Sequence, residues 1–148
     1  MSSRRTRLKK LLDLRQQQLE DCARELSRSR DRELRARERV DDETRELNTS
    51  LDRRASLAVE AANNDRWSSE NDWLELRALH HQAATAALGK AELSRQRAHA
   101  EVLHARTQLK KLEVLQDRLR REELRDEERR DRRLHDEVAQ KSASRGQR

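Results

Sequence analysis

The sequence contains no proline, phenylalanine or tyrosine, and only two glycines, two tryptophans and one cysteine among its 148 residues. A single cysteine cannot form an internal disulfide bond, so nothing points to an oxidising compartment. No apolar run approaches the ~18 residues that a membrane span needs, and the basic N-terminus is not followed by the apolar core of a secretory signal. These absences predict a cytoplasmic protein without membrane insertion.

The remaining composition is that of a long helix. Charged residues make up 43% of the chain and hydrophobic residues 32%, which is too polar to fill a thick core. A seam between two helices needs apolar residues at only about two positions in seven. Disorder is the competing interpretation of such polarity. The regular leucine spacing and the absence of proline favour an all-α coiled coil.

The first helix is expected over residues 7–51, after a frayed arm at residues 1–6. Leu8, Leu12, Leu19, Cys22 and Leu26 follow one another at heptad spacing, and Cys22 is expected to be a small seam residue. The apolar pattern then thins before it resumes at Val40. We therefore expect a slip in the heptad phase near residues 34–44.

Asn and Asp residues cluster before the second helix and predict a turn within residues 52–65, with Asn64 or Asp65 as the helix cap. The second helix is expected over about residues 66–140, with a frayed tail at 141–148. Gly89 lies in a stretch of small residues and is expected to allow a close approach of the two backbones. The expected seam of this helix is Trp73, Leu76, His80, Ala83 or Ala84, Ala87, Ala91, Ala98, Val102, Ala105, Leu109, Leu112 and Leu115 or Leu119.

Antiparallel pairing of helices with these lengths would end near residue 109 and leave about 30 residues of the second helix without a partner. The expected fold is an antiparallel two-helix coiled-coil hairpin with a longer, overhanging C-terminal helix. In the overhang, opposite charges recur four residues apart, in Arg118 with Glu122, Asp126 with Arg130 and Glu128 with Arg132. Such pairs stabilise a helix that is polar on all sides.

The basic excess of the chain lies at its two ends, since residues 1–10 carry five Lys or Arg and no acid, and residues 141–148 carry three and no acid. A nucleic-acid-binding basic coiled coil is one alternative, but its cationic region should be longer and free of acids. A generic coiled-coil scaffold, built as a parallel dimer of one continuous helix, is another. The Asn and Asp cluster disfavours that dimer.

No constellation of an enzyme or of a metal or cofactor site is present. The five histidines do not show metal-ligand spacing, two glycines cannot form a phosphate-binding loop, and a two-helix rod lacks a pocket that excludes water. Trp67 and Trp73 stand near the expected bend. They staple the turn, or at least one is exposed as an anchor for a partner, because tryptophan is enriched at binding hot spots.

Two motifs resemble the FliJ/YscO family of type III export stalk proteins. One is Asp65-Arg66-Trp67 followed by Trp73, and the other is the tail at residues 133–140, which is similar to the Leu/Met-Asp-Glu-x-Ala ending of the family. The chain departs from the family by lacking Phe and Tyr and by having His135 before the Asp-Glu pair.

The resemblance implies a non-enzymatic, cytoplasmic central stalk, peripheral to the inner-membrane export apparatus. It implies insertion into a hexameric export ATPase, stimulation of that ATPase, and coupling to the membrane export gate. Some family members also hold substrate chaperones, and a chaperone-escort role is the alternative. Trp67 and Trp73 would face the gate, and the residues expected in the ATPase pore are Arg118, Arg121, Arg125, Arg129, Arg133, Leu134 and Val138.

Overall fold

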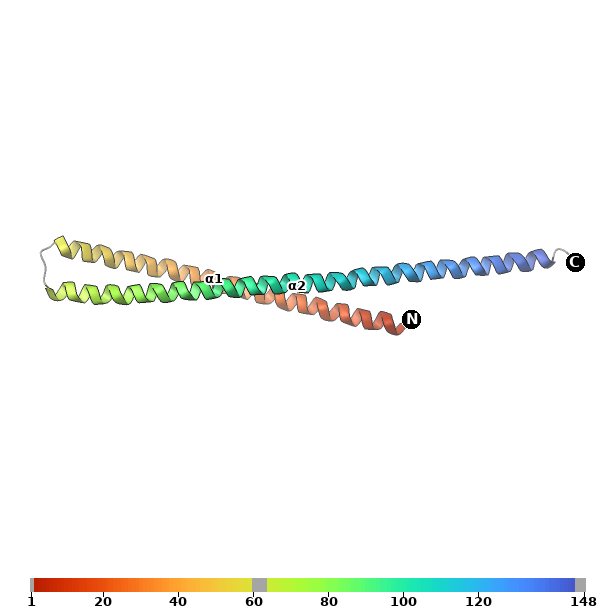
Figure 1. Ribbon diagram of the computed structural model, residues 1–148, viewed down its shortest axis with the longest axis horizontal. Coiled ribbons are helices and arrows are strands. Elements are labelled where there is room, and N and C mark those ends of the chain that lie inside the picture. The colour runs from red at the N-terminus through yellow and green to blue at the C-terminus, as the bar shows by residue number, and fades with distance from the viewer. Residues whose placement is uncertain (1, 60–63, 146–148) are drawn as a thin grey trace. The chain divides into compact units, whose positions relative to one another are not determined.

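The computed structural model describes residues 2–59 and 64–145, and these residues form two long helices, α1 (Ser2–Val59) and α2 (Asn64–Arg145) (Figure 1). No strand occurs in these two ranges. The two helices pack against each other, as the side-chain contacts given below show. The expectation of an all-α helical hairpin is confirmed.

Both helices extend further than the sequence pattern predicted. α1 continues to Val59 instead of ending near residue 51. Its last turns contain neither Gly nor Pro, and the Ser56 hydroxyl donates a hydrogen bond to the Asp52 carbonyl oxygen at 3.1 Å. The polar side chain is thereby accommodated inside the helix instead of ending it.

The helices also extend into the segments that were expected to be a frayed arm, a turn and a frayed tail. α1 begins at Ser2 and α2 reaches Arg145. Asn64 is the first residue of α2 and Asp65 lies in its first turn, so Asp65 does not precede the helix as a cap would. The part of the predicted turn at residues 60–63 and the side chain of Asn64 lie outside the described residues.

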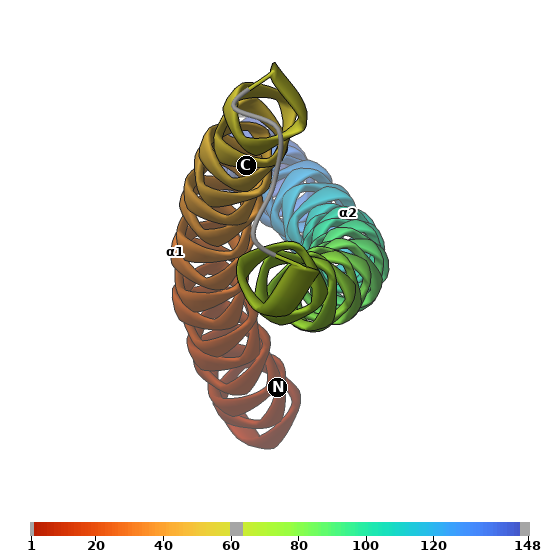
Figure 2. The same cartoon turned by 90° about the vertical axis from the view of Figure 1, so that its left-hand side faces the viewer.

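The chain divides into two units, each containing a segment of α1 and a segment of α2. Unit 1 comprises Met1–Gln18 and Ala105–Arg148, and unit 2 comprises Leu19–His104. Unit 1 carries 20 Lys or Arg against 11 Asp or Glu, whereas unit 2 carries 15 against 18. These counts place the cationic excess of the chain in unit 1. Figure 2 shows unit 2 from the side on which α1 ends and α2 begins.

The seam of α1 in unit 2 keeps one heptad phase throughout. An unbroken series of buried or half-buried residues follows spacings of three and four, with Glu25 and Thr44 half-buried beside it, so the slip expected near residues 34–44 does not occur. Polar side chains at several of these positions hide the period from a search for apolar residues. The series is Leu19, Cys22, Leu26, Ser29, Glu33, Ala36, Val40, Glu43, Leu47, Ser50, Arg54 and Leu57.

The α2 seam begins one residue away from the predicted position. Leu74 is buried, with 7% of its surface exposed, whereas the predicted Trp73 and Leu76 are 39% and 41% exposed. The next seam residues are the half-buried Arg77 and His81, so His80 also lies outside the seam. Ala87 was also predicted in the seam but is exposed, and Leu88 is half-buried instead. The predicted and observed seams coincide at Ala84, Ala91, Ala98, Val102, Ala105, Leu109, Leu112 and Leu119.

Polar contacts across the helix pair explain why Arg77 and His81 occupy the seam. The Arg77 guanidinium lies 3.5 Å from the Glu43 carboxylate and 3.6 Å from that of Glu46. His81 Nε2 lies 3.1 Å from Thr44 Oγ1, and this hydroxyl donates to the Val40 carbonyl oxygen at 2.8 Å. Because a hydroxyl has one proton, His81 Nε2 must be the donor to Thr44.

The apolar core is thin and made of small groups. In unit 2, Leu26, Ala98 and Val102 are buried together, and Leu19 and Cys22 pack against them. The placement of Cys22 as a small seam residue is confirmed. In unit 1, Leu8 is 8% exposed, while Leu109 and Leu112 are half-buried. Such a seam removes far less apolar surface from water than a globular core of equal length.

Buried polar residues interrupt the core of unit 2. Ser29 and Ser50 are each only 1% exposed and Glu33 is 7% exposed. The Glu33 carboxylate accepts a hydrogen bond from Arg37 at 2.7 Å and forms an ion pair with Arg95 of α2. A buried carboxylate separated from its cations leaves a charge uncompensated, so this contact disfavours slipped registers more than it adds stability.

The exposed ion pairs of unit 2 contribute less to stability and to the choice of register than the buried contact of Glu33 does. The Arg32 guanidinium, hydrogen-bonded to the Glu25 carboxylate, holds the pKa of Glu25 below its usual value, and the Ser29 hydroxyl also donates to this carboxylate. Because water and salt screen such exposed charges, this pair contributes little to the stability of the fold.

Gly89 does not mark a close approach of the two backbones, contrary to the expectation from sequence. A Cβ atom placed on this residue would meet no heavy atom within 4 Å. The glycine therefore costs helix stability without a packing gain inside this chain.

We expect Gly89→Ala to raise the free energy of unfolding by about 0.5–1 kcal/mol, because alanine loses less backbone entropy in a helix and its methyl group meets open space here. Thermal unfolding followed by circular dichroism measures the change. Ala87→Gly, at an exposed position of α2, is the matched control and should lower stability by a similar amount. A lower melting temperature for Gly89→Ala would contradict the open environment.

The seam register predicts unequal effects for two leucines that are two residues apart. Leu74→Ala should lower the free energy of unfolding by about 2–4 kcal/mol because it removes a buried side chain. Leu76→Ala should change it by less than about 0.5 kcal/mol because that side chain faces water. Urea titration of both variants measures the difference. A larger loss at Leu76 would restore the register expected from the apolar pattern.

Candidate functional site

The C-terminal part of α2 has no covering partner within unit 1. Every side chain from Glu127 to Ser142 is exposed, and Arg5 of α1 forms an ion pair with Glu123. The paired part of α2 thus extends beyond residue 109, because α1 begins at Ser2. We name residues 127–145 the C-terminal overhang, about 19 residues or roughly 28 Å of helix, shorter than predicted.

Five arginines form a row on α2 that begins before the C-terminal overhang and continues into it. They follow one another at spacings of three or four residues, which places them on one side of the helix, and all five are exposed. Arg129 lies 3.7 Å from Asp126, so acidic neighbours partly balance the row. The row consists of Arg118, Arg121, Arg125, Arg129 and Arg133.

Leu134 and Val138 lie on the other side of the overhang. They are 59% and 66% exposed, and each follows an arginine of the row, Arg125 or Arg129, by nine residues. Nine residues correspond to about two and a half helical turns, which reverses the direction of a side chain. The structure therefore separates the two apolar residues from the arginine row, although the sequence analysis grouped them.

The predicted charge pairs of the overhang are found in part. Arg132 and Glu128 lie 3.9 Å apart, as the spacing of four predicted. Asp126 forms an ion pair with Arg129 instead of the expected Arg130. Both contacts are between exposed side chains and add only tenths of a kcal/mol to helix stability.

The two tryptophans occupy different environments near the start of α2. Trp67 is half-buried, and the Arg54 guanidinium of α1 lies 5.0 Å from its ring centroid. Trp73 is 39% exposed, with the Arg77 guanidinium 4.6 Å from its ring. Trp67 thus helps to join the helices beside the bend, while Trp73 offers an aromatic surface held in place by a seam arginine.

An exposed apolar stripe runs along the outer side of α2, and Trp73 lies at the edge between this side and the seam, because it precedes the seam residue Arg77 by four residues. We name Trp73, Leu76, Leu79, Ala83 and Ala86 the outer stripe. Leu76 and Leu79 are 41% and 61% exposed, and Ala83 and Ala86 are exposed as well. The apolar period of the sequence predicted Leu76 in the seam and gave no sign of Leu79 and Ala86 as an exposed pair, because a helical period alone does not tell an inner face from an outer one.

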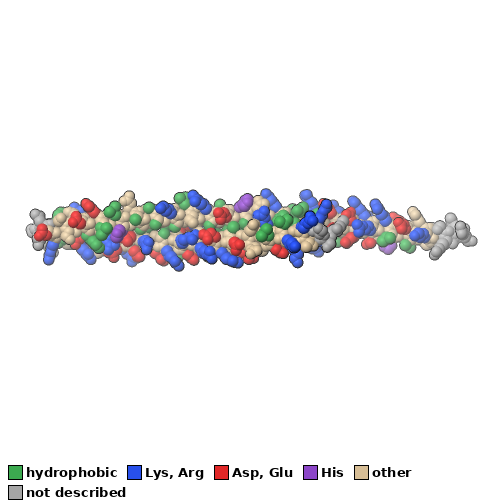
Figure 3. Space-filling model, turned by 90° about the horizontal axis from the view of Figure 1, so that it is seen from below, with side chains coloured by type: hydrophobic (Ala, Val, Ile, Leu, Met, Phe, Trp, Pro, Cys, Tyr) green, Lys and Arg blue, Asp and Glu red, His purple; other side chains and the backbone are tan. Residues whose placement is uncertain are grey.

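The rest of the surface is strongly charged. In the view of Figure 3, Lys and Arg side chains alternate with Asp and Glu side chains, and hydrophobic side chains appear between them. Against such a background a run of apolar side chains on one helix side is a distinct feature, since exposed apolar patches commonly mark interaction sites.

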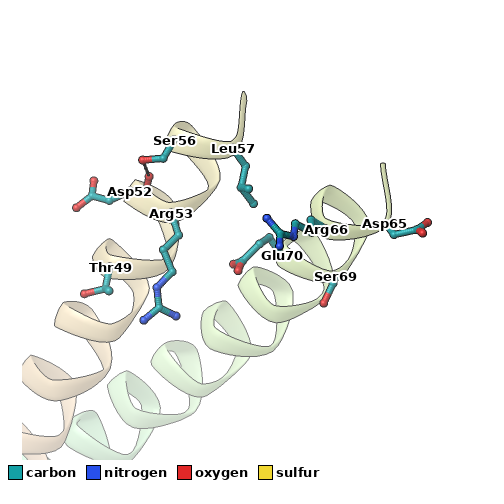
Figure 4. A pocket seen from close by; sticks show the side chains of 9 residues that line it. All are labelled: Thr49, Asp52, Arg53, Ser56, Leu57, Asp65, Arg66, Ser69 and Glu70. Atoms are coloured by element: carbon teal, nitrogen blue, oxygen red, sulfur yellow. Dashed lines mark hydrogen bonds between the residues drawn. The ribbon is translucent and has the colours of Figure 1, made fainter. Parts of the chain in front are cut away.

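A shallow groove lies between the last turns of α1 and the first turns of α2. In Figure 4 the side chains of Leu57, Arg66 and Glu70 point toward one another across this groove, while Asp65 points away from it. The lining combines cations and carboxylates with one leucine. It lacks the enclosed apolar walls of a small-molecule site.

The described residues 2–59 and 64–145 contain no group of three or more His, Cys, Asp or Glu side chains placed to hold a metal ion. Neither α1 nor α2, in the part that the structure describes, is long and apolar enough to cross a bilayer.

With two long helices packed against each other and no strand in the described residues, the protein belongs to the class of coiled-coil hairpins. The family model of the flagellar FliJ protein matches residues 3–148, and the chain belongs to this family. No curated protein and no solved structure matches the chain. Membership gives it a structural role related to the stalk of the flagellar type III export apparatus.

Proposed function

We propose that the protein is the central stalk of a flagellar export apparatus, cytoplasmic and peripheral to the inner membrane. The C-terminal overhang would enter the pore of the hexameric export ATPase and stimulate hydrolysis. The outer stripe, with Trp67 and Trp73, would contact the cytoplasmic region of the export gate. The observation that carries the ATPase contact is the exposure of every side chain from Glu127 to Ser142.

A helix that is exposed on all sides suits a partner that surrounds it. In the overhang, Arg129 and Arg133 lie on one side, and Leu134 and Val138 lie on the opposite side with Arg130 and Lys141 beside them. Different subunits of a ring would therefore meet different combinations of charge and apolar surface. That asymmetry is what an axle needs if its orientation is to favour one subunit over another. The small number of exposed apolar groups also limits sticking inside a pore.

The gate contact rests on the outer stripe. An amphipathic face with anchors at spacings of three and four is the pattern by which a helix docks into an apolar groove or onto a second helix. Trp73 lies at one end of this face, and its contact with Arg77 restricts the ring before binding. A preordered aromatic side chain loses less entropy when a partner covers it.

Removal of the overhang should abolish most of the stimulation of the export ATPase. The test uses a chain that ends after Asp126. This chain should still fold, because it retains α1 and the segment of α2 that pairs with α1, but it lacks the helix that would enter the pore. The variant Arg125→Gln/Arg129→Gln/Arg133→Gln should also lose stimulation, and the hydrolysis rate and hexamer content of the ATPase measure both effects. The control Arg30→Gln/Arg35→Gln/Arg39→Gln neutralises three exposed arginines of unit 2 and should stimulate normally. Full activity of the truncated chain would exclude the pore role.

Polar substitution on the outer stripe should weaken binding to the gate without affecting the ATPase. Leu76→Gln/Leu79→Gln should raise the Kd for the purified cytoplasmic region of the gate by about tenfold or more, since loss of two central apolar contacts costs at least ~1.4 kcal/mol. Isothermal titration calorimetry measures it. Leu34→Gln, at a leucine of α1 that is 58% exposed, is the control. Unchanged gate affinity with lost binding to a substrate chaperone would instead support the chaperone-escort role.

A further inference from the structure

The first turns of α1 present a second exposed face that neither proposed contact uses. Arg4, Arg7, Leu11 and Leu14 follow one another at spacings of three and four, and so share one side of the helix. Leu11 and Leu14 are 47% and 49% exposed, and Arg4, Arg7 and Lys10 are exposed too. We name these five residues the basic amphipathic face. In Figure 3, hydrophobic side chains lie beside Lys and Arg side chains near the N-terminal end of α1.

The cations of this face are available to an external anion. Among the described residues, no acidic side chain pairs with Arg4, Arg7 or Lys10, whereas Arg5 pairs with Glu123. The one acid within residues 1–18 is Asp13. It points away from Arg4, which it follows by nine residues, but it follows Lys10 by only three and therefore lies beside that cation on the helix, although no ion pair joins the two among the described residues. The face thus combines two leucines with three cations, and two of these cations, Arg4 and Arg7, have no acid beside them on α1.

We propose that the basic amphipathic face binds the surface of an anionic phospholipid membrane. Lys and Arg near such a surface attract its headgroups, and leucines between them enter the boundary between headgroups and acyl chains. Long basic side chains can remain at headgroup level while the leucines lie deeper. The binding is peripheral and reversible, because two leucines bury little apolar area.

Charge alone would equally suit nucleic acid, but two observations favour lipid. Nucleic-acid phosphates make no use of exposed leucines, and single strands are commonly held by stacking on aromatic rings. Both tryptophans of the chain lie in unit 2, so unit 1 has no aromatic residue of the Trp, Tyr or Phe type. The leucines therefore distinguish the two ligands.

This proposal goes beyond the stalk function and uses other residues. The overhang begins at Glu127, and the outer stripe lies in unit 2. Loss of lipid binding can therefore be measured in variants that still stimulate the ATPase, and the two proposals can fail independently.

Co-sedimentation of the full chain with vesicles tests the proposal. The vesicles are phosphatidylcholine alone, or phosphatidylcholine mixed with phosphatidylglycerol, at low and physiological salt. We expect binding to the mixed vesicles only, weakened by salt. Arg4→Gln/Arg7→Gln/Lys10→Gln should weaken it at least about tenfold, since each cation contributes near an anionic surface. Leu11→Gln/Leu14→Gln should weaken it several-fold at equal net charge.

The control Arg30→Gln/Arg35→Gln/Arg39→Gln removes the same charge from unit 2 and should bind vesicles normally; circular dichroism verifies that all variants fold. Failure of the native chain to bind the mixed vesicles would overturn the proposal. An equal loss in the control would do so too, because net charge and not this face would then be responsible. Native binding by Leu11→Gln/Leu14→Gln, or tighter binding to duplex DNA that ignores those leucines, would also overturn it.

Discussion

Two helices with no third layer must hold each other through a seam that is one side chain wide, and this constraint shapes the whole molecule. Each helix can bury only two residues of every seven. The buried set is accordingly small, with Leu26, Ala98 and Val102 as its best-packed cluster. The stabilisation from hydrophobic burial is proportional to the buried area, so the hairpin has little apolar stabilisation to spare, and most of its other side chains are exposed or only half-buried.

The narrow seam also explains its polar content. Ser29 and Ser50 are almost fully buried, and short side chains let two helices lie close together. Glu33 with Arg95, and Arg77 with Glu43, cross between the helices. A sequence of repeating heptads has several registers of similar apolar burial. Charged groups that find partners in only one of them select that register, at a cost in stability.

Exposure follows from the same constraint and is where the functional surfaces arise. Because α2 is longer than α1, the C-terminal overhang has no neighbour and all its described side chains face water. Because each helix buries one side only, α2 keeps the outer stripe and α1 keeps the basic amphipathic face. The exposed surfaces of the described residues therefore offer charge, a tryptophan ring and leucine side chains to a partner.

Helical character, the hairpin class, the family and the seam from Ala91 to Leu119 could be predicted from the sequence, because local propensity and apolar period carry them. The phase of the first turns of α2 could not, since the apolar stripe through Leu76 is as periodic as the true seam through Leu74. Only the pairing of Arg77 and His81 with α1 decided between them. The length of the overhang likewise depended on where α1 begins and ends, and no Gly or Pro marked either position. Gly89 was misread for the same reason: a glycine is visible in the sequence, but whether another backbone approaches it is decided by the partner helix. What the sequence determined is the set of local preferences, and what the tertiary structure decided is which of two equally periodic faces meets the partner.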